Sequence, residues 1–310
     1  MQTLFLIVLF ILGACLGSFL CCQARRLHLR EDGQSTNNTK ATKSSSKKSA
    51  KSAKNKSAKV TSGKSIKSTK GGSATKSNLG KWSVCLNCHK RLAWYDNIPI
   101  VSWLVLRGKC LKCGKPIGLA EILSELGVAI AFFALGCTIQ VTSANLTEWL
   151  IFLATLIFTL SLAFLSIYDG LYGKLPTSIL IVSIILGIIV LAGKEWSTLA
   201  AHGFSVVPVV IYPITSILIL GGTYLFLYIL SHGKWIGDGD WILCTGIALA
   251  LANPWLALIV LFLANALACL VIYPIIKKQK THKIHFGPFL AIAFIIVTAF
   301  AKPLIALSLF

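Results

Sequence analysis

The chain has 310 residues, of which 55% are hydrophobic, with 30 basic and only 10 acidic side chains and a formal charge of +20. Apolar runs near membrane-spanning length open the chain and recur after residue 118. A soluble core could not enclose so many such runs. The composition therefore excludes a soluble globular domain and predicts an all-α polytopic membrane protein.

The opening segment, residues 1–23, is predicted to be the first transmembrane helix, over about 3–23. No basic residue precedes its apolar stretch, and Arg25 and Arg26 follow it. This order indicates a retained span with its N-terminus outside rather than a cleaved signal peptide. The small residues of "GACLGSFL" at 13–20 predict close packing against another helix.

Residues 24–80 form a basic segment after this span. Between residues 31 and 80, twelve lysines accompany only two acids, so half of the net charge lies there. Nucleic-acid binding is one interpretation of such a tract. Its Lys, Ser, Ala, Thr and Gly residues, with almost no aromatic or large apolar ones, favour a solvated, disordered cytoplasmic insertion that contacts anionic membrane lipids.

A candidate metal-binding loop follows at residues 81–118. Cys85 and Cys88 form one CxxC pair, Cys110 and Cys113 form a second, and 21 residues separate the pairs. Two such turns present four thiolates at a spacing that suits one tetrahedral zinc ion. A redox dithiol is the alternative, but it needs one CxxC at a helix start rather than two pairs. Zinc would stabilise a cytoplasmic domain too small to fold on its core alone.

The remaining segment, residues 119–310, is predicted to hold the transmembrane core. Together with the first span it gives about eight transmembrane helices, since seven further runs follow at 119–141, 147–167, 178–193, 205–230, 241–253, 255–276 and 287–308. This threading places basic residues in alternate loops, at 24–118, 168–177, 231–240 and 277–286, and leaves the opposite loops nearly uncharged. The positive-inside rule makes the basic side cytoplasmic.

Two aspartates mark a candidate site on that cytoplasmic side. Asp169 follows the third span, and Asp240 ends "GDGD" just before the sixth. Carboxylates at membrane depth are costly, and a close pair can act as general base and general acid. The alternative is that Asp238 or Asp240 only caps a helix. Glu121 and Glu125 lie one helical turn apart. The sequence allows three roles for them: snorkelling to the membrane surface, pairing with a lysine, or facing the site.

Taken in order, these motifs resemble the bacterial type IV prepilin leader peptidase/N-methyltransferase family of GxGD membrane aspartic peptidases. "GSFL" with Arg26 is similar to the family's opening, and the segment 85–118 is similar to its zinc-binding loop. Asp169 with "LP" at 175–176 and "GDGD" at 237–240 match its two catalytic motifs. "FGPFLA" at 286–291 is similar to the start of its last span.

The resemblance implies a bacterial inner-membrane enzyme with its aspartates and zinc loop on the cytoplasmic side. Such an enzyme cuts the basic leader from type IV prepilins or type II secretion pseudopilins after glycine, and N-methylates the new terminus with S-adenosylmethionine. By this carry-over Asp169 and Asp240 are catalytic, with Gly237 and Gly239 supporting the second motif. The structural zinc ligands are then Cys85, Cys88, Cys110 and Cys113.

Three further interpretations complete the sequence reading. Asp240 at a helix N-terminus is assigned as the base, and Asp169 at a C-terminus as the acid. A non-enzymatic zinc-containing scaffold of pilus or secretion machinery is the alternative function. A proton or cation transporter is disfavoured because few polar residues, chiefly Asn265, lie inside the spans.

Overall fold

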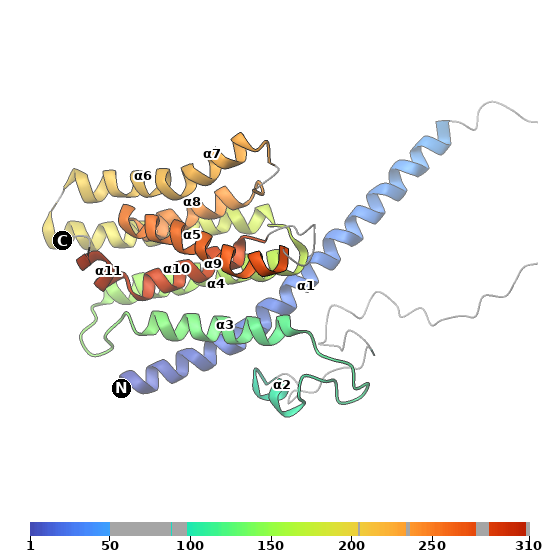
Figure 1. Cartoon of the computed structure of the whole chain (residues 1–310), viewed down its shortest axis with the longest axis horizontal. Coiled ribbons are helices and arrows are strands. Elements are labelled where there is room, and N and C mark those ends of the chain that lie inside the picture. The colour runs from blue at the N-terminus through green and yellow to red at the C-terminus, as the bar shows by residue number, and fades with distance from the viewer. Residues whose placement is uncertain (50–87, 89–97, 204, 234–235, 277–284, 308–310) are drawn as a thin grey trace, which may run out of the picture.

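The computed structural model describes residues 1–49, 88, 98–203, 205–233, 236–276 and 285–307, and most of these residues lie in helices. Within these ranges the extended backbone is limited to one isolated bridge, between Lys109 and Pro116. Figure 1 shows the long helices side by side, with α2 outside the bundle. The helices are α1 Gln2–Ser49, α2 Val101–Val105, α3 Leu119–Gly136, α4 Leu146–Tyr172, α5 Thr177–His202, η2 Val207–Ile211, α6 Tyr212–Ile217, η3 Leu218–Gly222, α7 Thr223–Leu230, α8 Asp240–Leu251, α9 Pro254–Ile276, α10 Gly287–Ala299 and α11 Ala301–Leu307.

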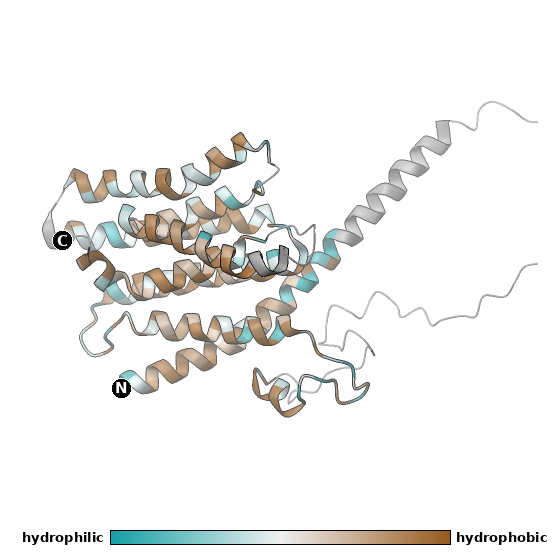
Figure 2. Ribbon diagram, in the orientation of Figure 1, coloured by the Kyte–Doolittle hydropathy of each residue, from teal (hydrophilic) through white to brown (hydrophobic). Residues whose placement is uncertain are grey.

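Within the described ranges, six helical segments are long and apolar enough to cross a membrane, and the bent pair of α10 and α11 makes a seventh if it is counted as one span. The six lie in α1, α3, α4, α5, the continuous run from η2 to α7, and α9. Figure 2 shows hydrophobic residues dominating the bundle. The predicted fold class, an all-α multi-pass membrane protein, is therefore confirmed.

The short helix α8 stands where the sequence predicts the sixth span, 241–253. Its 12 residues extend only about 18 Å, less than the roughly 30 Å of a bilayer core. Most of its side chains are buried because α5, η3 and α6 pack around it. Gly187 permits this contact, since a Cβ there would lie 2.7 Å from the carbonyl oxygen of Gly246. At its far end, Lys194 donates to the carbonyl of Ala250 at 2.6 Å. The span predicted at 241–253 is thus an enclosed helix.

The last predicted span, 287–308, also differs from a single straight helix. It bends by 75° between α10 and α11. Pro303 follows the break at Phe300 and has no amide hydrogen, so the backbone hydrogen-bond ladder cannot continue through it. The indole of Trp255 donates to the carbonyl of Leu304 at 3.1 Å and holds α11 against the start of α9.

Helix α1 differs most from its predicted extent. Its helical backbone does not end at residue 23 but continues to Ser49, into the segment predicted to be disordered, and projects beyond the bundle (Figure 1). A helix already formed in the membrane needs no new nucleus, and Ala, Arg, Lys and Gln extend it at little cost. Residues 50–80 of the predicted insertion lie outside the described residues.

The close packing predicted for residues 13–20 is confirmed. A Cβ on Gly13 would lie 2.7 Å from the carbonyl oxygen of Val128, and one on Gly17 would lie 2.5 Å from that of Ser124. The backbones of α1 and α3 therefore touch, as small residues allow in membrane helices. This contact fixes the start of α3, and with it the loop that carries the cysteines.

Candidate active site and metal-binding loop

Asp169 is buried in the last turn of α4. The helix ends at Gly173, whose φ of 63° lies in the left-handed region and whose amide donates to the carbonyl of Asp169 at 2.8 Å. Glycine adopts this conformation without a steric penalty. The chain then turns through Leu175 and Pro176 into α5, so the "LP" dipeptide follows the aspartate at once.

Asp240 is buried as the first residue of α8. Its Oδ2 accepts a hydrogen bond from the amide of Gly237 at 3.0 Å. The amide of Asp240 in turn donates to the carbonyl oxygen of Gly237 at 3.3 Å. The carboxylate of Asp240 is thus hydrogen-bonded within its own GxGD turn. Gly239 occupies the N-cap position, so a simple N-cap role does not describe Asp240.

Gly239 brings the two aspartate motifs together. A Cβ on this residue would lie 2.8 Å from the Cβ of Leu175 and 3.2 Å from Leu180. Any larger residue would therefore displace the GxGD turn from the "LP" turn between α4 and α5. The predicted supporting glycines have distinct local tasks: Gly237 contacts the carboxylate, and Gly239 allows the two turns to approach.

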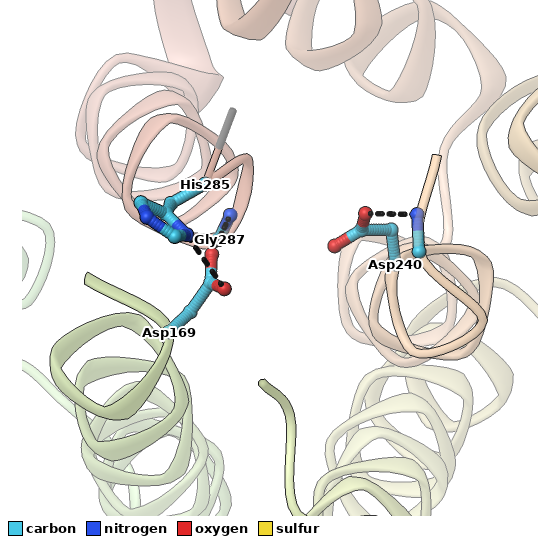
Figure 3. Close-up of polar contacts among 5 residues, drawn as sticks. Asp169, Asp240, His285 and Gly287 are labelled. Atoms are coloured by element: carbon cyan, nitrogen blue, oxygen red, sulfur yellow. Dashed lines mark hydrogen bonds and ion pairs between the residues drawn. The ribbon is translucent and has the colours of Figure 1, made fainter. Parts of the chain in front are cut away.

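The carboxylates of Asp169 and Asp240 face the same space from opposite sides, one from α4 and one from α8 (Figure 3). They are near enough for their charges to interact. Among the described residues, neither has a lysine or arginine ion-pair partner. Asp238, in contrast, is exposed. Two buried carboxylates that face one space are costly to ionise together, so the arrangement favours one ionised and one protonated group.

The start of α10 completes the surroundings of Asp169. The amide of Gly287 donates to its Oδ2 at 3.0 Å, and Nδ1 of His285 lies 3.6 Å from its Oδ1. Asp169 thus faces the N-terminus of α10, just as Asp240 lies at the N-terminus of α8. Both aspartates therefore face a helix N-terminus, so the helix ends do not favour Asp240 as the base and Asp169 as the acid.

Sequence reasoning noted "FGPFLA" at 286–291 but named no site residue there. The available signal was weak: Gly287 followed by Pro288 predicts a helix start, and a helix start offers free amides. Nothing in the sequence indicates that one of these amides meets a carboxylate 118 residues away.

The cysteine loop brings three of its four predicted ligands together. The sulfur atoms of Cys88, Cys110 and Cys113 all lie within 4.8 Å of one another. The amide of Gly114 donates to the carbonyl of Cys110 at 2.9 Å, and the positive φ angles of Gly108 and Gly114 allow the tight turn. Sulfurs bound to one zinc ion lie about 3.8 Å apart, so this group fits a metal ion. Cys85 lies outside the described residues.

Comparisons with known proteins show which proteins the chain is similar to. The family model described as "Bacterial Peptidase A24 N-terminal domain" matches residues 11–139, which contain the cysteine loop. A prepilin leader peptidase/N-methyltransferase of Dichelobacter nodosus is 30% identical over 212 residues, which cover 68% of this chain and 68% of that protein. The protein of the same name from Neisseria gonorrhoeae is 30% identical over 226 residues, 70% of this chain and 71% of that protein.

The chain belongs to the prepilin leader peptidase/N-methyltransferase family. A shorter match, to the family member of Myxococcus xanthus, is 50% identical over 52 residues, 17% of this chain and 16% of that protein. No solved structure matches the chain.

Glu121 and Glu125, whose roles the sequence leaves open, are both engaged away from the aspartates. Glu121 forms an ion pair of 2.5 Å with Arg25 of α1. Glu125 is buried and accepts a 2.7 Å hydrogen bond from the amide of Ile100, just before α2. These contacts connect three elements of this family member: α1, the cysteine loop and α3.

Asn265, the main polar residue inside the predicted spans, makes local contacts. Its Nδ2 donates to the carbonyl of Leu261 at 2.7 Å and to the hydroxyl of Tyr224 at 3.3 Å. The side chain thus links α9 to α7. This is the ordinary use of an amide between membrane helices, and it adds no support for a transport pathway.

Proposed function

We propose that Asp169 and Asp240 are the catalytic pair of a membrane aspartic endopeptidase. Its substrates are type IV prepilins or type II secretion pseudopilins, from which it removes the basic leader after a glycine. One observation carries the proposal: two buried carboxylates, from α4 and α8, face one space without a lysine or arginine partner among the described residues. The names of the relatives supply the substrate class.

The proposed reaction uses one proton held by the pair. The ionised aspartate takes a proton from water while the water oxygen bonds to the scissile carbonyl carbon. The protonated aspartate gives its proton to the carbonyl oxygen, which yields a neutral gem-diol. As the carbon–nitrogen bond breaks, the aspartate that took the water proton gives it to the leaving amine. A hydroxyl of the gem-diol gives its proton to the other aspartate as the new carboxyl group forms, which returns the pair to its singly protonated state.

The proposed setting is the bacterial inner membrane, with the aspartates on the cytoplasmic side. Asp169 lies in the predicted cytoplasmic loop 168–177, Asp240 ends the loop 231–240, and α3 starts where the basic loop 24–118 ends. The positive-inside rule favours this orientation. The apolar helix of the substrate would then lie in the bilayer and its basic leader in the cytosol.

The proposed metal is a structural zinc ion held by Cys85, Cys88, Cys110 and Cys113. A zinc ion held there would join the two ends of the loop and stabilise its fold. The tie from Glu125 to the amide of Ile100 would transmit this stability to α3.

The second proposed activity is methylation of the new N-terminus. S-adenosylmethionine would supply the methyl group to the amine freed by cleavage, with loss of one proton from that amine and release of S-adenosylhomocysteine. The support is the name that the relatives carry, and no residue is assigned to this step.

The test is to incubate the purified protein with a prepilin, with and without S-adenosylmethionine, and to weigh the products. We expect loss of the leader in both cases and one added methyl group only with the donor. Intact prepilin would overturn the peptidase proposal. A non-enzymatic scaffold would instead leave pilus assembly unharmed by Asp240→Asn but sensitive to the cysteine substitutions.

A further inference from the structure

The segment 285–287 contacts both oxygens of Asp169. The amide of Gly287 donates to Oδ2 at 3.0 Å, and the imidazole Nδ1 of His285 lies 3.6 Å from Oδ1. The carboxylate of Asp240 has different surroundings. Its Oδ2 accepts the amide of Gly237, and within the described residues no donor reaches its Oδ1. Of the two aspartates, only Asp169 therefore has contacts at both oxygens from the part of the chain that the structure describes.

Two glycines make room for this arrangement. A Cβ on Gly173 would lie 2.7 Å from Cε1 of the His285 ring, and a Cβ on Gly287 would lie 3.0 Å from Oδ2 of Asp169. The ring thus fits into the turn that ends α4, directly beside the helix that carries the aspartate. Figure 3 shows the imidazole and the Gly287 backbone on the same side of the carboxylate.

The side chain of His285 is 38% exposed, whereas that of Asp169 is 9% exposed. The ring therefore lies between the buried carboxylate and solvent. A spacing of 3.6 Å exceeds a hydrogen bond, but contacts in a catalytic site are commonly long before substrate binds and shorten in the complex.

We propose that His285 is a positioning residue for Asp169: its Nδ1 holds one carboxylate oxygen while the Gly287 amide holds the other. This inference rests on the proposed peptidase function. Orientation of a catalytic acid or base within a fraction of an ångström controls the chemical step. The ring touches Asp169 rather than the reacting atoms, so its loss should lower kcat and leave KM nearly unchanged.

The sharpest test compares two amide replacements. Asn places a nitrogen near the position of Nδ1, whereas the longer Gln places its nitrogen beyond it. We expect His285→Ala to lower kcat for prepilin cleavage on the order of tenfold, His285→Asn to recover most of that loss, and His285→Gln to recover little. His232→Asn, at an exposed histidine after α7, is the matched control and should behave as wild type.

Wild-type kcat in His285→Ala would overturn the proposal, and so would equal losses in His285→Asn and His285→Ala. A rise in KM that accounts for the whole loss would also overturn it, because it would indicate a substrate-binding role.

A second measurement needs no substrate and separates this proposal from the peptidase function. Carbodiimide labelling of the full-length protein, read by peptide mass spectrometry, reports the reactivity of Asp169 and Asp240 separately. We expect His285→Ala to change the labelling rate of Asp169 severalfold and to leave Asp240 unchanged. An unchanged rate at Asp169, or equal changes at both aspartates, would contradict a positioning role even if cleavage itself is observed. A change confined to Asp169 would support it even if wild-type protein leaves prepilin intact.

Discussion

Two pairs of acidic side chains lie near the same end of the helix bundle, and their surroundings differ. In the N-terminal half, Glu121 is paired with Arg25, and Glu125 accepts the amide of Ile100. In the other half, Asp169 and Asp240 face each other, and within the described residues His285 is the one basic side chain within 4.0 Å of either carboxylate.

The difference shows how carboxylates that stabilise the fold can be distinguished from carboxylates that are suited to proton transfer. A glutamate neutralised by an arginine has a stable charge and serves to join helices. Two buried carboxylates that face each other cannot both ionise cheaply, so the arrangement costs stability and is suited to proton transfer. We therefore expect the two pairs to respond oppositely to neutral substitution.

The largest effect should follow from Asp169→Asn or Asp240→Asn. Each amide removes a group that accepts and donates the reacting proton, so we expect cleavage to fall on the order of a thousandfold or more. The thermal unfolding midpoint should stay the same or rise, because a costly buried charge is removed. Initial rates on a purified prepilin measure the effect. Asp238→Asn is the matched control, and a larger loss there than at Asp240 would reverse the ranking of the two.

Cys110→Ser should affect metal content far more than chemistry. Removing one of the four proposed thiolate ligands should cost about 3 kcal/mol of zinc binding, or on the order of a hundredfold in affinity. We expect zinc per chain to fall and protease cleavage within 98–118 to increase, with a smaller loss of activity than in the aspartate variants. Cys137→Ser, at an exposed cysteine outside the loop, is the control. Unchanged zinc in Cys110→Ser would contradict the assigned ligand set.

Arg25→Met tests the structural pair. It leaves Glu121 without its cation, and we expect the free energy of unfolding to fall by roughly 1–2 kcal/mol. The double variant Arg25→Met with Glu121→Gln should recover part of this loss, because the isolated charge is gone. Cleavage should change less than about threefold in both. A loss of cleavage comparable to that of Asp240→Asn would place this pair in the catalytic machinery.

Deletion of residues 36–76 should have the smallest effect. This lysine-rich tract contains almost no large apolar residues, so it cannot contribute a packed core. We expect cleavage in anionic vesicles to stay within about twofold of wild type. Loss of cleavage would show that the tract takes part in binding the substrate.

Features of this fold that depend on the sequence of a single helix were predictable. The long apolar runs of α3, α4, α5 and α9 specify membrane helices by length and composition alone. The close approach of α1 to α3 was readable from Gly13 and Gly17, because small residues have few other uses in an apolar helix.

Features that depend on contacts between distant segments were not predictable. Whether the apolar run 240–251 crosses the bilayer depends on α5, η3 and α6 around it. The approach of Gly287 and His285 to Asp169 joins residues more than a hundred positions apart. The sequence indicated which aspartates to pair, but it could not indicate that the N-terminus of α10 faces one of them.

The most direct test of the paired-aspartate account is the single-turnover cleavage rate of Asp169→Asn, Asp240→Asn and the double variant on one prepilin. Residues that act as a unit are strongly non-additive. If the carboxylates share one proton, each single variant should lose nearly all activity and the double variant should be no slower than either. Losses that multiply in the double variant, or one single variant within about tenfold of wild type, would contradict the account.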